Sequence, residues 1–205
     1  MGGKIICFEG IDGSGKGHQI HKLLEVSPEA VLYQYPDKNW EIGKVIDSFL
    51  KKRTRLSPTH QFFLYLSDIL KDQGRIKDQI EEGKIIFLDR YITSTLVYQD
   101  ASGFEMKKGI KIVKELDFIE PDLTILIDIH PEISISRKKK QNGKLEFFER
   151  KSFLEKVRKN FLKLRKTGTF SKRWLLVDGM NPPDEISEQI NESLEKLMCT
   201  NTNFY

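Results

Sequence analysis

The sequence predicts an α/β fold in which a five-stranded parallel sheet carries helices on both faces. Five short runs of β-branched, aromatic and other apolar residues indicate buried strands, and helical patterns lie between them. Strands whose residues are apolar on both faces are typical of a parallel sheet that is covered by helices on both sides. The alternation of strands and helices is typical of a doubly wound arrangement. The expected strands are residues 4–9, 30–35, 84–89, 123–128 and 174–178.

Three of the expected helices have clear start signals. Ser57 and Pro58 predict the start of a long helix that runs to about residue 82, because Ser caps helix N-termini and Pro fits the first turn. Pro131 predicts a second helix, which runs to about residue 141. Pro183, followed by two acidic residues, predicts a last helix that ends near residue 198.

Length and composition predict one domain spanning residues 1–205. Of the 205 residues, 39% are hydrophobic and 31% are charged, which is ordinary for a globular domain. No stretch approaches the ~18 to 20 apolar residues of a membrane span, and the N-terminus lacks a signal-peptide pattern. Cys7 and Cys199 are far apart and suggest neither a zinc site nor a disulfide framework. We therefore expect a soluble cytoplasmic protein with no membrane partner.

Positive charge is concentrated in residues 137–173. This segment contains fifteen Lys or Arg and three Glu, so its net charge is +12, and the rest of the chain carries −8 of the total of +4. Such a segment indicates either an anionic partner or a basic helical face in water. Its Phe residues have helical spacing and no nucleic-acid-binding motif accompanies them, so we expect no nucleic-acid partner.

A glycine-rich phosphate-binding loop follows the first expected strand. The sequence fits the first seven positions of the pattern GxxxxGK[ST], and it stands between a strand and a helix as that pattern requires. Backbone N–H groups of such a loop surround phosphates, the helix N-terminus contributes its positive dipole, and Lys adds a point charge. The expected ATP-binding residues of the loop are Gly10, Ile11, Asp12, Gly13, Ser14, Gly15, Lys16 and Gly17.

One loop position departs from the pattern. Gly17 stands where Ser or Thr normally offers a hydroxyl to Mg²⁺, and His18 follows it. Either Mg²⁺ is held by phosphates, water and Asp89, or activity is impaired; Ser14 is a further candidate, although its expected place faces the phosphates.

Asp89, Arg90 and Tyr91 end the third expected strand, next to the phosphate loop. Four of the five strands end in or beside an acid, and such an acid is often only a turn former. At this position Asp89 is suited to holding metal-bound water, and the Arg90 fork is suited to bridging phosphate oxygens. The pair could instead form a structural salt bridge, but its place beside the phosphate loop favours phosphoryl transfer.

Several motifs in order and spacing resemble the thymidylate kinase family. They cover nearly the whole chain, and the second and third of them are much more specific than the phosphate loop. The motifs are EGIDGSGK at 9–16, YPDK with EIGK at 35–38 and 41–44, DRY with Ser94 at 89–94, and EPDL at 120–123.

The resemblance implies roles for individual residues. Asp12 would meet the 3′-hydroxyl of the acceptor sugar, and Arg90 would contact the transferred phosphoryl group, with Lys16, Arg90 and Asp12 as the catalytic set. Asp89 would act on the metal through water, and Arg137 would contact ATP. The implied acceptor-binding residues are Asp12, Tyr35, Lys38, Tyr65, Arg90, Ser94, Tyr98 and Gln99.

The chain also departs from the family pattern. Ile69 stands where the family has an Arg that hydrogen-bonds the base, and Phe147 stands where the lid has an Arg. The lid is expected at about 137–150, where Arg137, the Lys residues at 138–140 and Arg150 could supply the charge.

The resemblance implies an ATP-dependent kinase that converts dTMP to dTDP with Mg²⁺, and it implies a homodimer. Ile69 leaves open a kinase for another nucleoside monophosphate. Gly17 and Phe147 leave open a degenerate paralogue that binds nucleotides in a regulatory role.

Overall fold

A computed structural model of the protein describes residues 2–142 and 150–199. Its centre is a parallel five-stranded sheet with the strand order β2-β3-β1-β4-β5, which confirms the predicted fold class. Three of the five strands have the predicted bounds. The strands are β1 (Lys4–Glu9), β2 (Val31–Gln34), β3 (Ile85–Asp89), β4 (Leu123–Asp128) and β5 (Trp174–Asp178).

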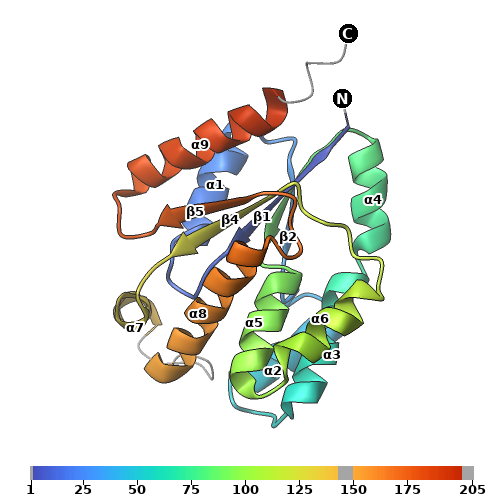
Figure 1. Cartoon of the computed structure of the whole chain (residues 1–205), viewed down its shortest axis with the longest axis vertical. Coiled ribbons are helices and arrows are strands. Elements are labelled where there is room, and N and C mark those ends of the chain that lie inside the picture. The colour runs from blue at the N-terminus through green and yellow to red at the C-terminus, as the bar shows by residue number, and fades with distance from the viewer. Residues whose placement is uncertain (1, 143–149, 200–205) are drawn as a thin grey trace.

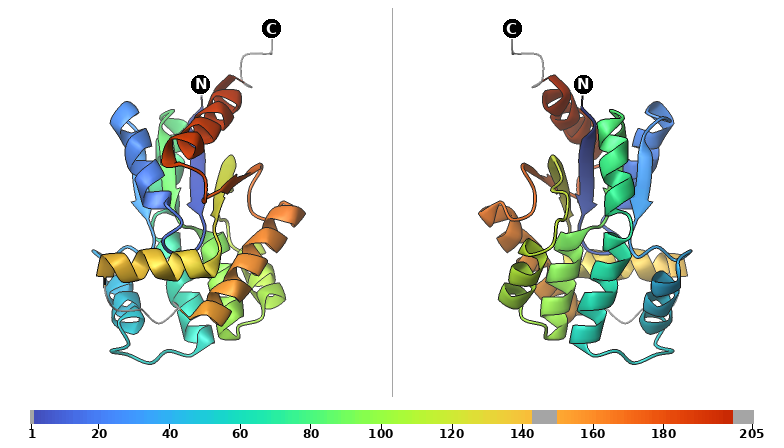
Figure 2. Two further views of the ribbon diagram at one scale, coloured as in Figure 1. Left: turned by 90° about the vertical axis from the view of Figure 1, so that its left-hand side faces the viewer. Right: turned by 90° about the vertical axis from the view of Figure 1, so that its right-hand side faces the viewer.

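Helices cover both faces of this sheet (Figure 1). On one face lie α1 (Lys16–Val26) and α9 (Pro183–Cys199), and on the other lie α3 (Pro58–Leu70), α5 (Ile92–Ser102) and α8 (Lys151–Thr167). Figure 2 shows α7 (Pro131–Asn142) lying across the carboxyl ends of the strands. The remaining helices are α2 (Glu41–Leu50), α4 (Gln73–Glu81) and α6 (Met106–Lys114).

The alternation of side chains along β1 divides the core into two layers. Ile6 and Phe8 pack with buried residues of α1 and α9, whereas Ile5 and Cys7 pack with residues of α3, α5 and α8. Successive residues of a strand point to opposite faces of the sheet, so a strand that is buried on both sides must be apolar throughout. Within the described ranges, no helix is long and apolar enough to cross a membrane.

The long helix predicted to run from residue 58 to about residue 82 is wrong. The chain forms α3 and α4 instead, and a tight turn at Lys71 and Asp72 separates them. The Asp72 carboxylate accepts hydrogen bonds from the Tyr35 hydroxyl (3.1 Å) and from Lys71 (2.6 Å). The turn redirects α4 along β3, where the carbonyl of Ile80 accepts a hydrogen bond from the N–H of Gly3 (2.9 Å). These long-range contacts favour the bend over a continuous helix.

Helix α2 packs closely on the loop that precedes it. A Cβ atom added to Gly43 would lie 1.8 Å from the carbonyl oxygen of Asp37, whereas a Cβ added to Gly74 of α4 would meet nothing within 4 Å. Glycine at position 43 therefore allows backbone contact between α2 and the loop that follows β2.

We expect Gly43→Ala and Gly74→Ala to change thermal stability in opposite directions. Replacing Gly by Ala inside a helix gains about 1 kcal/mol of helix propensity, which corresponds to roughly 2 to 4 °C in Tm for a protein of this size. Gly74→Ala should show this gain, but Gly43→Ala should lower Tm because the loop must move. Thermal melts followed by circular dichroism test this, and an equal gain in both variants would show that the α2 contact is not tight.

Candidate functional site

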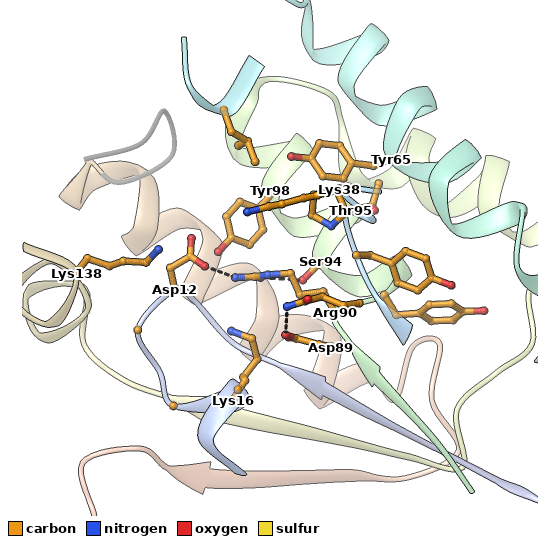
Figure 3. Close-up of a pocket in the computed structure, with 18 of the residues that line it drawn as sticks. Asp12, Lys16, Lys38, Tyr65, Asp89, Arg90, Ser94, Thr95, Tyr98 and Lys138 are labelled. Atoms are coloured by element: carbon orange, nitrogen blue, oxygen red, sulfur yellow. Dashed lines mark hydrogen bonds and ion pairs between the residues drawn. The ribbon is translucent and has the colours of Figure 1, made fainter. Parts of the chain in front are cut away.

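A cavity of about 870 Å³ opens at the carboxyl ends of the strands (Figure 3). The structure places most of the residues predicted for the site around it, although Gly10, Ile11 and Ser14 are not among the lining residues. The predicted residues that line it are Asp12, Gly13, Gly15, Lys16, Gly17, Tyr35, Lys38, Tyr65, Asp89, Arg90, Ser94, Tyr98, Gln99 and Arg137. Gln34, Leu50 and Thr95 also line the cavity, although the sequence alone predicts no role for them.

The phosphate loop lies under one end of the cavity. Gly10 adopts φ +142° and Gly15 adopts φ +102°, a backbone region that favours glycine. At Gly10 a Cβ would also lie 2.5 Å from the carbonyl oxygen of Ile127. The loop then enters α1, whose first N–H groups have no partner within the helix and attract anions.

Lys16 folds back over the loop. Its ammonium donates to the carbonyls of Gly10 (2.9 Å) and Ile11 (3.2 Å). Burial, together with the nearby charge of Arg90, lowers the pKa of Lys16 from 10.5 to about 8. A bound phosphate would reverse this effect, because an anion stabilises the charged form of a lysine. The position is therefore prepared for a strongly anionic ligand.

Arg90 joins the phosphate loop to α5. The backbone of Arg90 has φ +69°, a value that is uncommon outside glycine and that occurs often at functional sites. Its backbone N–H donates to the carbonyl of Phe8 in β1 (3.0 Å). The guanidinium forms an ion pair with Asp12 (2.6 Å) and donates to the Gly10 carbonyl and the Ser94 hydroxyl (3.2 Å each). Figure 3 shows this pair spanning the middle of the cavity.

The charge of Asp12 is fixed by the same cations. Burial by itself would raise the pKa of this carboxyl, but Arg90, Lys16 and Lys138 together lower it to about 2. Asp12 is thus ionised at neutral pH and orients the Arg90 guanidinium.

Glu9 fixes the start of α5 beneath the cavity. Its fully buried carboxylate accepts hydrogen bonds from the N–H groups of Tyr91 and Ser94 (3.0 Å each) and from the hydroxyls of Thr93 and Ser94. The N-terminus of a helix favours a negative charge. The role of Glu9 is therefore to position the turn that carries Arg90.

The other acids at strand ends have separate partners. Asp128 forms a bidentate ion pair with Arg158 (2.7 and 2.8 Å), and Asp178 accepts a hydrogen bond from the N–H of Met180 (2.9 Å). Asp89 differs, because one carboxylate oxygen accepts from Gln34 (3.0 Å) while the other is buried without a hydrogen-bond partner in the described part of the chain. Among the strand-end acids that the structure describes, Asp89 is thus the one with a buried oxygen that no hydrogen bond satisfies.

Helices α3 and α5 form the wall at the other end of the cavity. Tyr65 and Ile69 lie one turn apart on α3, and Thr95 and Gln99 lie one turn apart on α5. Gln99 is 1% exposed, and both polar atoms of its amide lack hydrogen-bond partners among the described residues. An unpaired buried amide is costly, so a ligand with its own donor and acceptor would satisfy it.

Helix α7 adds positive charge along the cavity. Arg137 donates to the carbonyls of Gly13 (3.0 Å) and Gly179 (3.2 Å), so it also braces the phosphate loop. Lys138 and Lys140 line the cavity as well, and Figure 3 shows Lys138 directed toward Asp12. Half of the expected lid, residues 143–149 with Phe147 among them, lies outside the described residues.

Comparison with known proteins agrees with this arrangement. The profile of the thymidylate kinase family matches residues 8–190. A thymidylate kinase of Thermoanaerobacter sp. (strain X514) is 37% identical over 208 residues, which cover 97% of this chain and all of that protein. A probable thymidylate kinase of Archaeoglobus fulgidus is 34% identical over 198 residues, which cover 95% of this chain and 96% of that protein.

Solved structures show the same fold. The thymidylate kinase of Candida albicans superimposes with a TM-score of 0.79 at 28% identity, covering 95% of this chain and 92% of that chain. The thymidylate kinase of Ehrlichia chaffeensis superimposes with a TM-score of 0.73 at 22% identity, covering 95% and 99%. From its sequence, its sheet and the match along nearly its whole length, this chain belongs to the thymidylate kinase family.

Proposed function

We propose that this protein transfers the γ-phosphoryl group of ATP to dTMP, giving ADP and dTDP. The observation that carries the proposal is the position of Arg90, which lies between the phosphate loop and the α3–α5 wall and contacts Asp12 and Ser94. Two phosphorylated ligands that enter from opposite ends of the cavity would meet at this guanidinium. Family membership supports the same activity.

The reaction needs little chemistry from the protein beyond positioning and charge. An oxygen of the dTMP phosphate attacks the γ-phosphorus of ATP, and the bond from that phosphorus to the bridging oxygen breaks as ADP leaves. The attacking oxygen is already an anion, so no side-chain base is required. Lys16 and Arg90 would stabilise the charge on the transferred group, while Asp12 orients Arg90 and would accept a hydrogen bond from the sugar 3′-hydroxyl.

The residues of the cavity fit a magnesium ion held mainly by substrate and water. Asp89 has one buried oxygen without a hydrogen-bond partner, and no cluster of three acidic, His or Cys side chains suited to a metal occurs among the described residues. Gly17 offers no hydroxyl. When bound, Mg²⁺ neutralises charge on the β- and γ-phosphates, and Asp89 would accept hydrogen bonds from water on the ion.

The α3–α5 wall fits the base of the acceptor nucleotide. We assign Tyr65 to stacking on the pyrimidine ring, and Gln99 to its edge, because an amide matches the N3–H donor and O4 acceptor of thymine. Tyr98 would lie beside the sugar, and Lys38 and Tyr35 would lie beside the phosphate.

A coupled assay of ADP release from ATP and Mg²⁺ with a panel of nucleoside monophosphates tests the proposal. We expect dTMP to have the highest kcat/KM. The second candidate is a kinase for another pyrimidine monophosphate. Ile69 favours it, because this apolar side chain offers the base no hydrogen bond beside Gln99 at the α3–α5 wall. A higher kcat/KM for dCMP or dUMP would select it, and no turnover of any monophosphate would refute both.

We also propose a homodimer in the cytoplasm. Val45 of α2 with Phe63 and Leu70 of α3 are large apolar side chains exposed by 42%, 49% and 37%. The two helices contact each other, and exposed apolar surface of this kind is typical of interfaces. Light scattering coupled to gel filtration tests the dimer.

Alanine substitutions test the two proposed catalytic cations, Lys16 and Arg90. Lys16→Ala and Arg90→Ala should each lower kcat/KM at least ~10²-fold, because one group that stabilises transition-state charge contributes several kcal/mol. Arg75→Ala, which removes an exposed arginine of α4 outside the cavity, is the matched control and should leave kcat/KM unchanged. Circular dichroism verifies folding, and near-normal turnover in a folded Lys16 or Arg90 variant would refute the assignment.

Substitutions of Tyr65 test whether its ring stacks on the base. Tyr65→Ala should raise the KM for dTMP about 5- to 150-fold, the equivalent of roughly 1 to 3 kcal/mol of stacking, with little effect on the KM for ATP. Tyr65→Phe keeps the ring and should stay near wild type. Equal increases in both KM values would mean that Tyr65 supports the fold rather than the base.

Restoring a hydroxyl at Gly17 tests how the magnesium ion is held. A Cβ at this position meets nothing within 4 Å, so Thr fits the first turn of α1. Gly17→Thr should lower the Mg²⁺ concentration needed for half-maximal activity and raise kcat, because it restores a hydroxyl for the metal. Asp89→Asn should cost less activity in that background than in the wild type.

Mg²⁺ titrations at fixed ATP in the wild type, the two single variants and the double variant measure both effects. If Gly17→Thr left the metal dependence unchanged in a folded protein, another group, such as Ser14 or His18, would hold the role.

A further inference from the structure

The loop after β2 supplies one side of the acceptor end of the cavity. Tyr35, Pro36 and Lys38 of this loop line the cavity, and the loop then turns into α2. On its far side lies Lys71, at the joint between α3 and α4. Lys71 is not among the residues that line the cavity, and the reaction described above gives it no role.

The Lys71 ammonium connects the joint to the loop. It contacts the carboxylates of Asp72 (2.6 Å), Asp37 (3.3 Å) and Asp68 (3.5 Å), and it donates to the Asp68 carbonyl (3.0 Å). Asp37 belongs to the loop, whereas Asp68 and Asp72 belong to the end of α3 and the turn after it. The side chain of Lys71 is only 15% exposed, so water screens these ion pairs less than pairs on the surface.

Further hydrogen bonds converge on the same carboxylates. The N–H of Asp37 donates to Asp68 (2.9 Å), and the Tyr35 hydroxyl donates to Asp72 (3.1 Å). The carboxylate of Asp68 is fully buried. Without the Lys71 ammonium between them, the carboxylates of Asp37, Asp68 and Asp72 would repel one another. Because Asp37 belongs to the loop, this repulsion would push the loop away from the joint.

Aromatic rings of the loop complete the environment of the ammonium. Its nitrogen lies 5.2 Å from the ring centre of Tyr35 and 5.3 Å from that of Trp40, which is within the range of cation–π attraction. Burial alone would lower the pKa of Lys71, but the carboxylates of Asp72, Asp68 and Asp37 raise it above its ordinary value. Lys71 therefore remains charged at neutral pH.

From these contacts we propose that Lys71 is a positioning residue that ties the phosphate side of the acceptor site to its base side. The loop presents Lys38 to the cavity, and α3, which ends at the same joint, presents Tyr65 and Ile69. Lys71 fixes the distance between these two walls. The assignment of the walls to the acceptor nucleotide rests on the proposed function, whereas the connection between loop and joint does not.

Steady-state kinetics separate positioning from a general loss of structure. Lys71→Met removes the charge and keeps the length of the side chain, so the KM for dTMP should rise at least ~10-fold while kcat and the KM for ATP change less than ~3-fold. Lys71→Arg keeps the charge and should recover most of the affinity. Lys77→Met, at an exposed position of α4, is the matched control and should behave as wild type.

Trp40 provides a readout that needs no activity. It is one of two tryptophans, so in a Trp174→Phe background the tryptophan emission comes from Trp40 alone. Without nucleotide, Lys71→Met should increase quenching of Trp40 by acrylamide, and Lys77→Met should not. Asp37→Ala cuts the connection from the loop side and leaves Lys71 paired with Asp68 and Asp72, so it should also increase quenching even if Lys71→Met fails to fold.

The outcomes are distinct. Unchanged quenching in folded Lys71→Met, or in Asp37→Ala if the former does not fold, would overturn the proposal. Equal increases in the KM values for dTMP and ATP would overturn it too, because a positioning residue of the acceptor site acts on one substrate. A wild-type protein that does not phosphorylate dTMP would refute the proposed function, and Trp40 quenching would still decide whether Lys71 secures the loop.

Discussion

The buried carboxylate of Glu9 sets the geometry on which the rest of the site depends. It ends β1, the central strand, and accepts hydrogen bonds from the backbone and hydroxyl groups of residues 91–94 at the start of α5. Burial raises the pKa of this carboxyl, and the charge of Arg90 and the hydroxyls of Ser94 and Thr93 oppose the rise. Since β1 also leads into the phosphate loop, one side chain fixes α5 relative to that loop.

Arg90 is the main consequence of this constraint. The turn that Glu9 fixes leaves Arg90 with a positive φ, and its backbone N–H bonds to β1 while its guanidinium reaches Asp12. Such a backbone conformation costs about 1 to 3 kcal/mol and persists only where the surroundings determine it. The surrounding hydrogen bonds therefore hold the arginine in place before any substrate binds, which is the arrangement that favours electrostatic catalysis.

The acidic side chains at the centre of the cavity offset its basic ones, so positive charge for the ligands must come from another part of the protein. Glu9, Asp12 and Asp89 oppose Lys16 and Arg90, so these five side chains do not by themselves supply the positive charge that two phosphorylated ligands require. Helix α7 lies across the carboxyl ends of the strands (Figure 2), and its Lys138 and Lys140 line the cavity. This places the beginning of the basic segment 137–173 at the site, whereas Arg158 of the same segment is paired with Asp128 outside it.

The sheet and the phosphate loop could be predicted because their signals are local. Continuous apolar runs mark β4 and β5 to the residue, and the glycine spacing marks the loop. Helix α5 has no such signal, because it is buried nearly all round and lacks an amphipathic pattern. The bend at Lys71 and the unpaired amide of Gln99 depend on residues distant in sequence, so spacing alone does not reveal them.

Local sequence also could not assign the strand-end acids. All four acids look alike in the sequence. In the structure, Asp128 pairs with Arg158, Asp178 accepts a hydrogen bond from the turn that follows it, and Glu9 accepts hydrogen bonds from the start of α5. Asp89 differs from them because one of its oxygens is buried and has no hydrogen-bond partner in the described part of the chain.

Glu9→Gln is the most direct test of whether this buried carboxylate places the catalytic arginine. The variant keeps the shape of the side chain, but it replaces one acceptor oxygen with an N–H₂ donor that faces the donors of residues 91–94. We expect kcat for dTMP phosphorylation to fall at least ~10²-fold in protein that is folded by circular dichroism, because a displacement of about 1 Å at a catalytic group costs that much. A folded Glu9→Gln protein whose kcat stays within ~3-fold of wild type would contradict this role.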